Sequence, residues 1–179
     1  MADNFNIKYL DIKYNREMEM PLEKMVKILL PLEIDINFHI ETLKAQGIII
    51  RTNLLRRSKF LGGEGSIKLN LQPLESYKNI WKEDYNKNIN KINKAVDETK
   101  GVVILFEDKP IDAKYHIWCG GSTENAENVV DNPIRYLRRV LCDYCKDSPY
   151  WQKEKTFTVK ELGEKLETKF PDTNINSDT

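Results

Sequence analysis

The sequence predicts an α+β fold, with a small mixed or antiparallel sheet packed with three to four helices in a single domain. Apolar residues alternate over residues 5–20, which is the period of strands, and then recur at helical spacing. A chain of 179 residues is also long enough to bury one core. We expect the domain to span residues 1–170 and the polar tail at 171–179 to be disordered.

The first half of the chain contains two predicted helices. The alternating N-terminal stretch reads as one or two strands. Apolar spacing then predicts a helix from Pro21 to Glu33, because proline suits the first turn of a helix. A second helix is expected over residues 38–57, with Asp35 or Asn37 as its cap.

The region from residue 74 to residue 99 is predicted to form one long amphipathic helix. Its aromatic residues could be imagined as platforms for sugar rings, but residues at helical spacing more often pack into a core. The residues of this stripe are Tyr77, Trp81, Tyr85, Ile89, Ile92 and Val96.

The remaining elements are short. Residues 62–72 read as a loop, and a hairpin is expected to turn around Asp108 and Lys109. Residues 151–170 predict a strand followed by a helix that Thr158 caps.

The charge balance gives no reason to expect nucleic acid or an anionic membrane as a partner, because 28 Lys and Arg residues match 28 Asp and Glu residues. No apolar run reaches the roughly 18 residues of a membrane span. The N-terminal MADNFNIK also lacks the hydrophobic core of a signal peptide.

Glu33 is the carboxylate most strongly marked by its surroundings, because it ends an apolar run that includes Ile28, Leu29, Leu30 and Leu32. Burial among these side chains would favour the protonated carboxyl group, which is the form that donates a proton. The alternative is an ordinary glutamate in the last turn of an amphipathic helix, with its carboxylate in water.

Three cysteines and one histidine have the spacing of a tetrahedral zinc site. His116 and Cys119 form H-x-x-C, and Cys142 and Cys145 form C-x-x-C after an interval of 22 residues. A structural zinc ion would join the two turns. A disulfide between two of the cysteines, or three separate thiols, remain open as alternatives.

The adjacent Gly120 and Gly121 would let backbone N–H groups approach a ligand closely, since no β-carbon intervenes. A tight turn with positive φ explains the pair equally well. Nearby side chains that could bind a sugar or simply hold the backbone are Tyr115, His116, Thr123, Glu124 and Glu127.

Two sequence blocks resemble the stage II sporulation protein D family, the SpoIID/LytB domain. Residues 38–52, FHIETLKAQGIIIRT, resemble the family segment F-x-x-E-A-L-K-A-Q-A-x-x-A-R-T, and family members place a Glu shortly before it, as Glu33 is here. Residues 100–129, KGVVILFEDKPIDAKYHIWCGGSTENAENV, resemble the family motif T-x-G-x-V-x-x-x-x-G-x-P-I-x-A-x-Y-H-S-x-x-G-G-x-T-E-x-A-E-x-V. Together the blocks cover most of residues 20–150.

The resemblance implies a lytic transglycosylase that cleaves MurNAc–GlcNAc bonds in peptidoglycan glycan strands freed of stem peptides, during engulfment in sporulation. Glu33 would serve as general acid and base, and the muramoyl C6 hydroxyl would attack, so the chemistry needs no second carboxylate and no cofactor. The implied substrate-binding residues are Lys44, Gln46, Arg51, Tyr115, His116, Gly120, Gly121, Thr123, Glu124 and Glu127.

The resemblance also implies a place and partners. The expected location is extracytoplasmic, between the mother cell and the forespore, although this chain shows no signal or anchor. A cell-wall amidase and sporulation membrane proteins are the implied protein partners.

Departures from the family pattern keep a second function open. Ile34 and Asp35 replace a Met-Pro pair, Ile117 replaces a Ser and Val130 replaces a Trp. The alternative is a non-catalytic glycan-binding module that enhances a cell-wall amidase. Many family members also carry a His and two Cys, resembling zinc ligands, in the region of residues 62–72, where this chain has neither.

Overall fold

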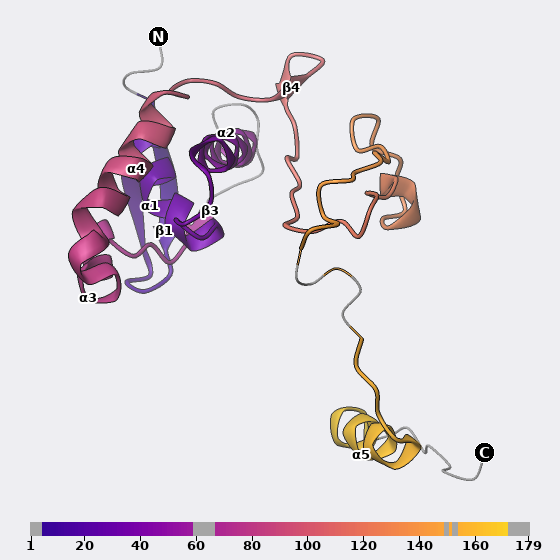
Figure 1. Cartoon of the computed structure of the whole chain (residues 1–179). Coiled ribbons are helices and arrows are strands. Elements are labelled where there is room, and N and C mark those ends of the chain that lie inside the picture. The colour runs from indigo at the N-terminus through magenta and orange to yellow at the C-terminus, as the bar shows by residue number, and fades with distance from the viewer. Residues whose placement is uncertain (1–4, 59–66, 149–150, 152–153, 172–179) are drawn as a thin grey trace. The chain divides into compact units, whose positions relative to one another are not determined.

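Helices and short strands occur together in this chain, which confirms the predicted α+β class (Figure 1). The computed structural model describes residues 5–58, 67–148, 151 and 154–171. Most of the predicted disordered tail therefore lies outside the described residues.

The chain divides into two compact units, Met1–Tyr115 and His116–Thr179. The prediction of one domain over residues 1–170 stays a prediction. Sequence periodicity detects individual helices and strands, whereas a division into units depends on which of them contact one another.

The sheet of the first unit has three strands in the order β2-β1-β3. β1 (Asn6–Asp11) pairs antiparallel with β2 (Arg16–Pro21) and parallel with β3 (Ile67–Leu69), so the predicted small sheet is mixed. The loop predicted over residues 62–72 is wrong at β3, because a strand of three residues is too short to show periodicity. Residues 62–66 lie outside the described part of the chain.

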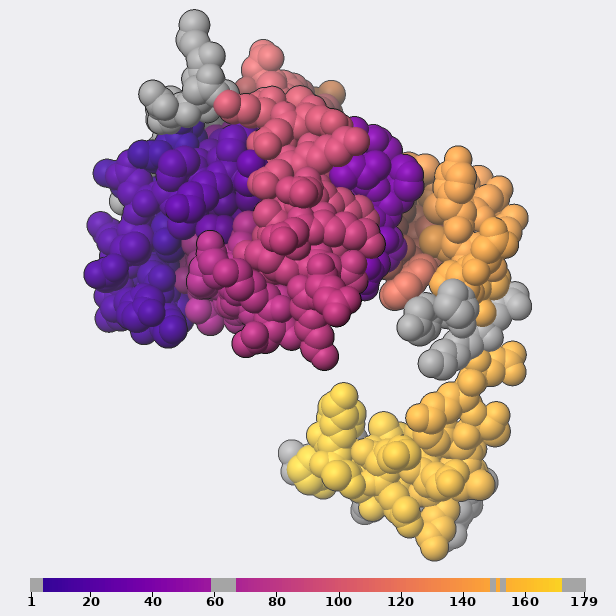
Figure 2. All heavy atoms as spheres, turned by 60° about the vertical axis from the view of Figure 1, so that its left-hand side comes forward, coloured from indigo at the N-terminus to yellow at the C-terminus, as the bar shows by residue number. Residues whose placement is uncertain are grey.

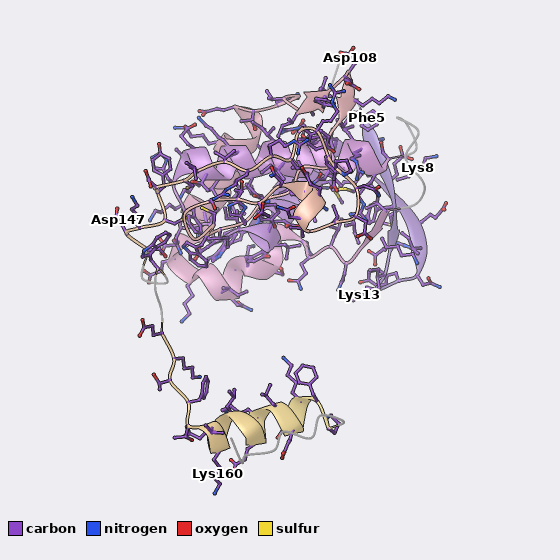
Figure 3. All side chains as sticks on the ribbon, turned by 90° about the vertical axis from the view of Figure 1, so that its right-hand side faces the viewer. Phe5, Lys8, Lys13, Asp108, Asp147 and Lys160 are labelled. Atoms are coloured by element: carbon purple, nitrogen blue, oxygen red, sulfur yellow. The ribbon has the colours of Figure 1, made fainter. Side chains whose placement is uncertain are left out.

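The alternation along β1 sorts its side chains between core and solvent. Ile7 and Tyr9 are 0% and 3% exposed, and Ile67 of β3 lies beside Tyr9 at 1%. Lys8 of β1 and Lys13 after it point outward to solvent (Figure 3).

The two predicted helices in the first half of the chain are confirmed. α1 (Leu22–Glu33) begins directly after Pro21, and α2 spans Ile40–Arg57. The predicted capping residue of α2 is wrong: His39 is the cap, and its Nδ1 accepts a hydrogen bond from the Glu41 N–H at 3.3 Å.

The single long helix predicted over residues 74–99 is wrong in its continuity. The chain forms two 3₁₀ turns, η2 (Leu74–Tyr77) and η3 (Lys82–Asp84), on either side of α3 (Lys78–Trp81), and then α4 (Tyr85–Asp97). The break falls at Lys82, whose φ of 46° lies in the left-handed region.

Two aromatic residues of this region, Tyr77 and Trp81, pack as core. The Tyr77 and Trp81 rings stack with centroids 4.5 Å apart, and Trp81 packs against the hydrophobic core. Tyr77 is only 9% exposed, so the interpretation of these two side chains as core residues is confirmed.

The core forms where α1, α2 and α4 pack on one another, with α1 lying against the β1–β2 pair. Figure 2 shows the atoms of α4 directly against those of the N-terminal elements. The core includes the fully buried side chains of Ile7, Met25, Val26, Leu30, Leu43, Ile67, Ile92 and Val96. None of the helices in the described ranges combines the length and apolar character needed to cross a membrane.

The predicted hairpin and C-terminal helix are both present. β4 (Leu105–Phe106) pairs with β5 (Lys109–Pro110) around a two-residue turn, in which Glu107 and Asp108 both have positive φ. In the second unit, α5 (Val159–Lys169) is capped by Thr158 as predicted. Residues 154–158 form no strand, so the described part of the predicted final strand is wrong.

α5 is held at its start by a reciprocal cap. The Thr158 hydroxyl accepts from the Glu161 N–H at 3.2 Å, and the Glu161 carboxylate accepts from the Thr158 N–H at 2.9 Å. Lys160 in the first turn points into solvent (Figure 3). None of the described residues of α5 is buried. The cap therefore contributes more to the local stability of this helix than side-chain packing does.

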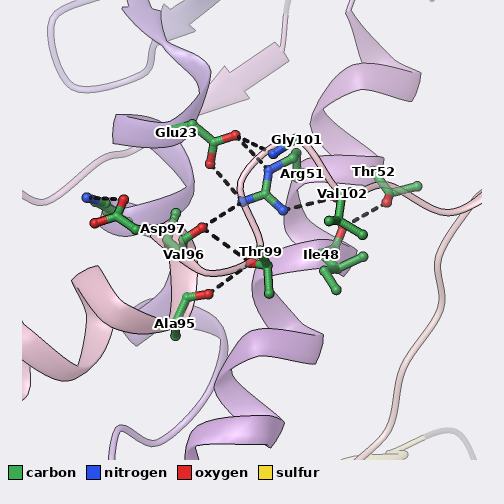
Figure 4. A network of polar contacts seen from close by, with 11 residues as sticks. Glu23, Ile48, Arg51, Thr52, Ala95, Val96, Asp97, Thr99, Gly101 and Val102 are labelled. Atoms are coloured by element: carbon green, nitrogen blue, oxygen red, sulfur yellow. Dashed lines mark hydrogen bonds and ion pairs between the residues drawn. The ribbon is translucent and has the colours of Figure 1, made fainter. Parts of the chain in front are cut away.

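A buried ion pair joins α1 to α2 (Figure 4). The Arg51 side chain is 0% exposed and donates from Nε and Nη2 to the two carboxylate oxygens of Glu23, at 2.9 and 2.7 Å. Arg51 Nη1 also donates to the Val102 carbonyl at 3.1 Å, and the Glu23 carboxylate accepts from the Gly101 N–H at 3.3 Å. The pair therefore also holds the segment that follows α4.

We predict that Arg51→Met lowers the free energy of unfolding by about 3 kcal/mol, because it leaves the largely buried Glu23 carboxylate without its charged partner. Urea denaturation measures this change. The matched control is Arg56→Met on the same helix, whose ion pair with Asp112 is solvent-exposed and should contribute about 1 kcal/mol or less. Equal losses in the two variants would contradict the assigned role of Arg51.

Candidate functional site

Glu33 and Tyr115 meet although 82 residues separate them in the chain. Glu33 is the last residue of α1, and Tyr115 follows the β4–β5 hairpin. The Tyr115 hydroxyl donates a hydrogen bond to Oε2 of Glu33. The remaining carboxylate oxygen makes no hydrogen bond to the described residues and is open to a ligand.

A pocket of about 120 Å³ lies beside this pair. The volume is below the roughly 300 Å³ of a site that encloses a whole small molecule, so it fits one substituent of a larger ligand. Its walls come from α1, α2, β3 and Tyr115. The lining residues are Leu29, Glu33, Gln46, Ile49, Ile50, Asn53, Leu54, Arg57, Leu69 and Tyr115.

Gln46 contributes an amide donor to this pocket. The residue is 4% exposed, and its Nε2 atom is buried without a hydrogen-bond partner among the described residues. The amide lies close enough to the Tyr115 hydroxyl to lower the pKa of that phenol slightly. The distance and angle between the two groups nevertheless do not make a hydrogen bond. A buried donor without a partner costs about 1–3 kcal/mol, and a ligand acceptor would remove this cost only if the side chain turned so that Nε2 faced the pocket.

Asn53 holds the segment that carries Tyr115. Its side-chain amide donates to the Ala113 carbonyl at 3.0 Å, and its carbonyl accepts from the Ala113 N–H at 2.9 Å. The two bonds fix the backbone two residues before Tyr115. Asn53 is thus the link between α2 and the phenol that contacts Glu33.

The hydrogen bond to Glu33 raises the pKa of Tyr115 to about 12, and partial burial and the negative charge of Glu33 act in the same direction. Gln46 acts weakly in the opposite direction. Tyr115 therefore stays a neutral donor throughout the physiological pH range.

Of the two interpretations of Glu33, burial is wrong, and an exposed glutamate in the last turn of an amphipathic helix is confirmed. Ile28, Leu29 and Leu30 turn into the core, but Glu33 is exposed at the end of α1. Helical spacing places Glu33 on the same face as Leu29 and Leu30, but Glu33 is the last residue of α1 and lies beyond the part of that face that packs into the core.

Two of the predicted substrate-binding residues on α2 have protein partners and do not line the pocket. Lys44 forms ion pairs with Glu41 and Glu98, at 2.8 and 2.7 Å. Arg51 is enclosed in its pair with Glu23. A substrate contact by Arg51 is therefore wrong, since its side chain has no exposed surface, and its role is to join helices.

In the second unit, the tight-turn interpretation of the two glycines is confirmed. Gly120 and Gly121 have φ of 62° and 106°, which side chains with a β-carbon rarely adopt. A β-carbon at Gly121 would lie 3.1 Å from the Trp151 ring. The Gly121 carbonyl accepts a hydrogen bond from the Cys142 N–H at 2.9 Å. This bond joins the glycine turn to the first residue of the C-x-x-C motif.

The polar residues after this turn support the backbone. The Thr123 hydroxyl accepts from the Val140 N–H at 2.8 Å. Glu124 accepts from the Asn125 N–H at 2.7 Å and from the Asn128 amide at 2.8 Å, and these bonds hold the pKa of Glu124 below its usual range.

Glu127 forms an ion pair with Arg138. The pKa of Glu127 is lowered, chiefly by a hydrogen bond from its own backbone N–H and also by Arg138. Partial burial acts in the opposite direction and raises the pKa, but it does not outweigh these contacts. His116 is exposed. Substrate binding by the predicted residues of the second unit stays a prediction.

The three cysteines converge, as their spacing predicted. The sulfur atoms of Cys119, Cys142 and Cys145 all lie within 4.8 Å of one another, and those of Cys119 and Cys145 are 3.6 Å apart. All three are free thiols. His116 does not belong to this group in the described part of the chain, so the four-ligand set predicted with His116 is wrong.

The thiols differ in their surroundings. Hydrogen bonding from the backbone and then the side chain of Cys119 lowers the pKa of the Cys145 thiol. At Cys119 the Gly121 backbone acts to lower the pKa, but the neighbouring Cys142 thiol, partial burial and Cys145 outweigh it and raise the pKa.

The sequence model of the stage II sporulation protein family, SpoIID, matches residues 11–106. The chain belongs to the SpoIID family. The match includes Glu33 and Gln46 and ends before Tyr115 and the cysteines.

Full-length relatives of this SpoIID chain extend the similarity. Stage II sporulation protein D of Bacillus amyloliquefaciens is 34% identical over 157 residues, covering 82% of this chain and 46% of that protein. The protein of the same name from Bacillus subtilis (strain 168) is 32% identical over 166 residues, or 87% of this chain and 48% of that protein. The chain spans about half the length of these two relatives.

Of the residues predicted from sequence, the structure brings Glu33, Gln46 and Tyr115 together around one pocket of this SpoIID chain. Asn53 and Arg57 also line it and were not predicted. Their signal was the spacing on α2, since residues seven and eleven positions after Gln46 lie on the same helical face.

We predict that Glu33→Gln moves the pKa of Tyr115 from about 12 back toward its ordinary value of 10.0, because the main cause of the shift is removed. The folded pKa is raised, so the neutral hydrogen-bonded phenol is fully present below pH 10.0 and is lost as the pH rises through about 12. Carbon-13 NMR of the tyrosine ring measures the titration, with Tyr115→Phe to assign the resonance. An unchanged titration in Glu33→Gln would refute the contact.

Proposed function

We propose that this chain is a lytic transglycosylase domain that cleaves MurNAc–GlcNAc bonds in peptidoglycan glycan strands freed of stem peptides. The observation that carries the proposal is the Glu33–Tyr115 hydrogen bond at the edge of a pocket with an unpaired Gln46 amide. Glu33 and Gln46 both lie within the part of the chain that matches the SpoIID family.

In the first step, Glu33 in its protonated form donates its proton to the glycosidic oxygen between the two sugars, and the bond from that oxygen to C1 of the muramoyl residue breaks. In the second step, the resulting carboxylate removes the proton of the muramoyl C6 hydroxyl. Its oxygen then bonds to C1 and closes a 1,6-anhydro ring. The proton that Glu33 gave up is thereby restored, and no water is consumed.

A single carboxylate is sufficient for this reaction. Among the pocket-lining residues that the structure describes, Glu33 alone carries a carboxyl group. A hydrolase of the usual kind needs a second carboxylate as nucleophile or to activate water, whereas an internal hydroxyl here replaces both.

Substrate binding would also provide the protonated acid. Glu33 is exposed in the free protein, and a glycan strand lying over the pocket would exclude water from it. Burial disfavours the charged form of a carboxyl group, so the covered site favours the proton donor. The Tyr115 hydroxyl would hold the carboxyl group in place during both steps.

The remaining polar groups would bind the sugar substituents. The Gln46 amide would donate to a carbonyl such as that of an acetamido group. Arg57 would bind hydroxyls or the lactyl carboxylate, because its guanidinium is a fork of donors. The pocket volume of about 120 Å³ fits one such substituent.

The names of the two Bacillus relatives support a role in sporulation. We propose that the domain acts outside the cytoplasm, between the mother cell and the forespore, together with a cell-wall amidase and sporulation membrane proteins. The chemistry itself requires no cofactor.

Glu33→Gln should keep the fold and glycan binding but lower turnover by at least about 10²-fold, because the amide can neither donate nor accept the required proton. Digestion of glycan strands without stem peptides measures the turnover. The matched control is Glu41→Gln, which removes an exposed carboxylate outside the pocket and should leave activity within about twofold. Glu33→Gln with activity near that of wild type would refute the assignment.

We expect the products to carry 1,6-anhydro ends, lighter by one water than reducing ends, which mass spectrometry distinguishes. Reducing ends would indicate hydrolysis instead.

Glycan binding without any cleavage by the wild-type chain would favour the second candidate, a non-catalytic module that enhances a cell-wall amidase. The exposure of Glu33 in the free protein favours this candidate, because a reacting carboxyl group usually lies in a site that excludes water.

A further inference from the structure

We propose that Cys119, Cys142 and Cys145 form a zinc site in which three thiolates bind one ion and the fourth position takes a ligand from outside the cysteine set. The site lies wholly within the second unit, and it does not depend on the function proposed for the Glu33 pocket.

The distances between the sulfur atoms match zinc coordination. A Zn–S bond of about 2.3 Å in a tetrahedral site places neighbouring sulfurs about 3.8 Å apart. Here all three sulfurs lie within 4.8 Å of one another, and one pair is 3.6 Å apart. A disulfide would need about 2.05 Å, and it would include only two of the three sulfurs.

The backbone brings the sulfurs together independently of any ion. The Gly121 carbonyl accepts from the Cys142 N–H at 2.9 Å, and Ser122 forms a β-bridge with Leu141. The Gly120 and Gly121 turn then directs the chain away from Cys119. Backbone hydrogen bonds thus hold together two segments that 22 residues separate in the sequence. Cys119 lies beside one end of this contact, and Cys142 and Cys145 lie beside the other segment.

The donor set favours zinc. Soft thiolates bind zinc and cuprous copper and exclude magnesium and calcium, which take oxygen ligands. Structural zinc has four ligands, and among the described residues no His, Asp or Glu joins the three cysteines. The fourth ligand would therefore be water or a group on a partner, which distinguishes this site from the closed four-ligand set predicted from sequence.

The test begins with the whole chain, purified under reducing conditions and analysed for metal as isolated and after incubation with zinc and desalting. We expect one zinc per chain. Cys119→Ser, Cys142→Ser and Cys145→Ser should each retain less than a tenth of it. The matched control is His116→Ala, which should retain zinc at the wild-type level because His116 lies outside the sulfur group.

A second measurement uses the wild-type chain alone, so that misfolding of the cysteine variants cannot decide the result. Zinc should slow alkylation of all three thiols at least tenfold, with each site identified by mass spectrometry. Cobalt substituted for zinc should give an absorption band whose intensity corresponds to three thiolate ligands.

Several results would overturn the proposal. One is a reduced wild-type chain that holds no zinc under either condition while its three thiols react freely. Another is a protein isolated without reductant that is two hydrogens lighter and has one free thiol, which would identify a disulfide. Loss of zinc in His116→Ala would also contradict the three-thiolate set.

Discussion

Arg51 is buried with its guanidinium bound to both carboxylate oxygens of Glu23, and this contact sets α2 against α1. The same two side chains hold the backbone of Gly101 and Val102, where the chain leaves α4. A desolvated charge is tolerated only when its partner lies in good geometry, so the pair favours the arrangement of these elements in which both hydrogen bonds form. The end of α1 and the pocket face of α2 are placed by that arrangement.

A second set of bonds completes the pocket from the same helix. The Asn53 amide makes two hydrogen bonds to Ala113, which brings Tyr115 to Glu33. Thr52, the preceding residue on α2, accepts from the Ile104 N–H at 3.0 Å and so holds the chain before the hairpin. Three successive residues of one helix, Arg51 to Asn53, therefore fix the segment that supplies the phenol.

The elements that the sequence predicted correctly are those whose signal is local. Apolar spacing identified α1 and α2, and the cysteine spacing identified a cluster that the structure confirms. The sequence could not show which cation on α2 is desolvated, because burial depends on the residues that pack from other elements. Arg51 was therefore interpreted as a substrate ligand, although its side chain is fully buried.

The remaining misses have the same origin. Nothing in the sequence between Tyr77 and Tyr85 marks the left-handed conformation of Lys82, which separates α3 from α4. The apolar residues before Glu33 left its burial open. Glu33 shares the helix face of Leu29 and Leu30, but as the last residue of α1 it lies beyond the part of that face that packs into the core.

The Gln46 amide is the feature of the pocket that a purely structural account leaves unexplained. Every other buried side-chain nitrogen or oxygen among the described residues has a partner, whereas Nε2 of Gln46 has none. At about 1–3 kcal/mol, an unpaired buried donor is a substantial cost in a domain of marginal stability. Leucine at this position would avoid the cost and still fill the space. Nε2 itself is closed to solvent, so a ligand that presents a carbonyl oxygen would supply the missing partner once the Gln46 side chain turns toward the pocket, which Glu33 also lines.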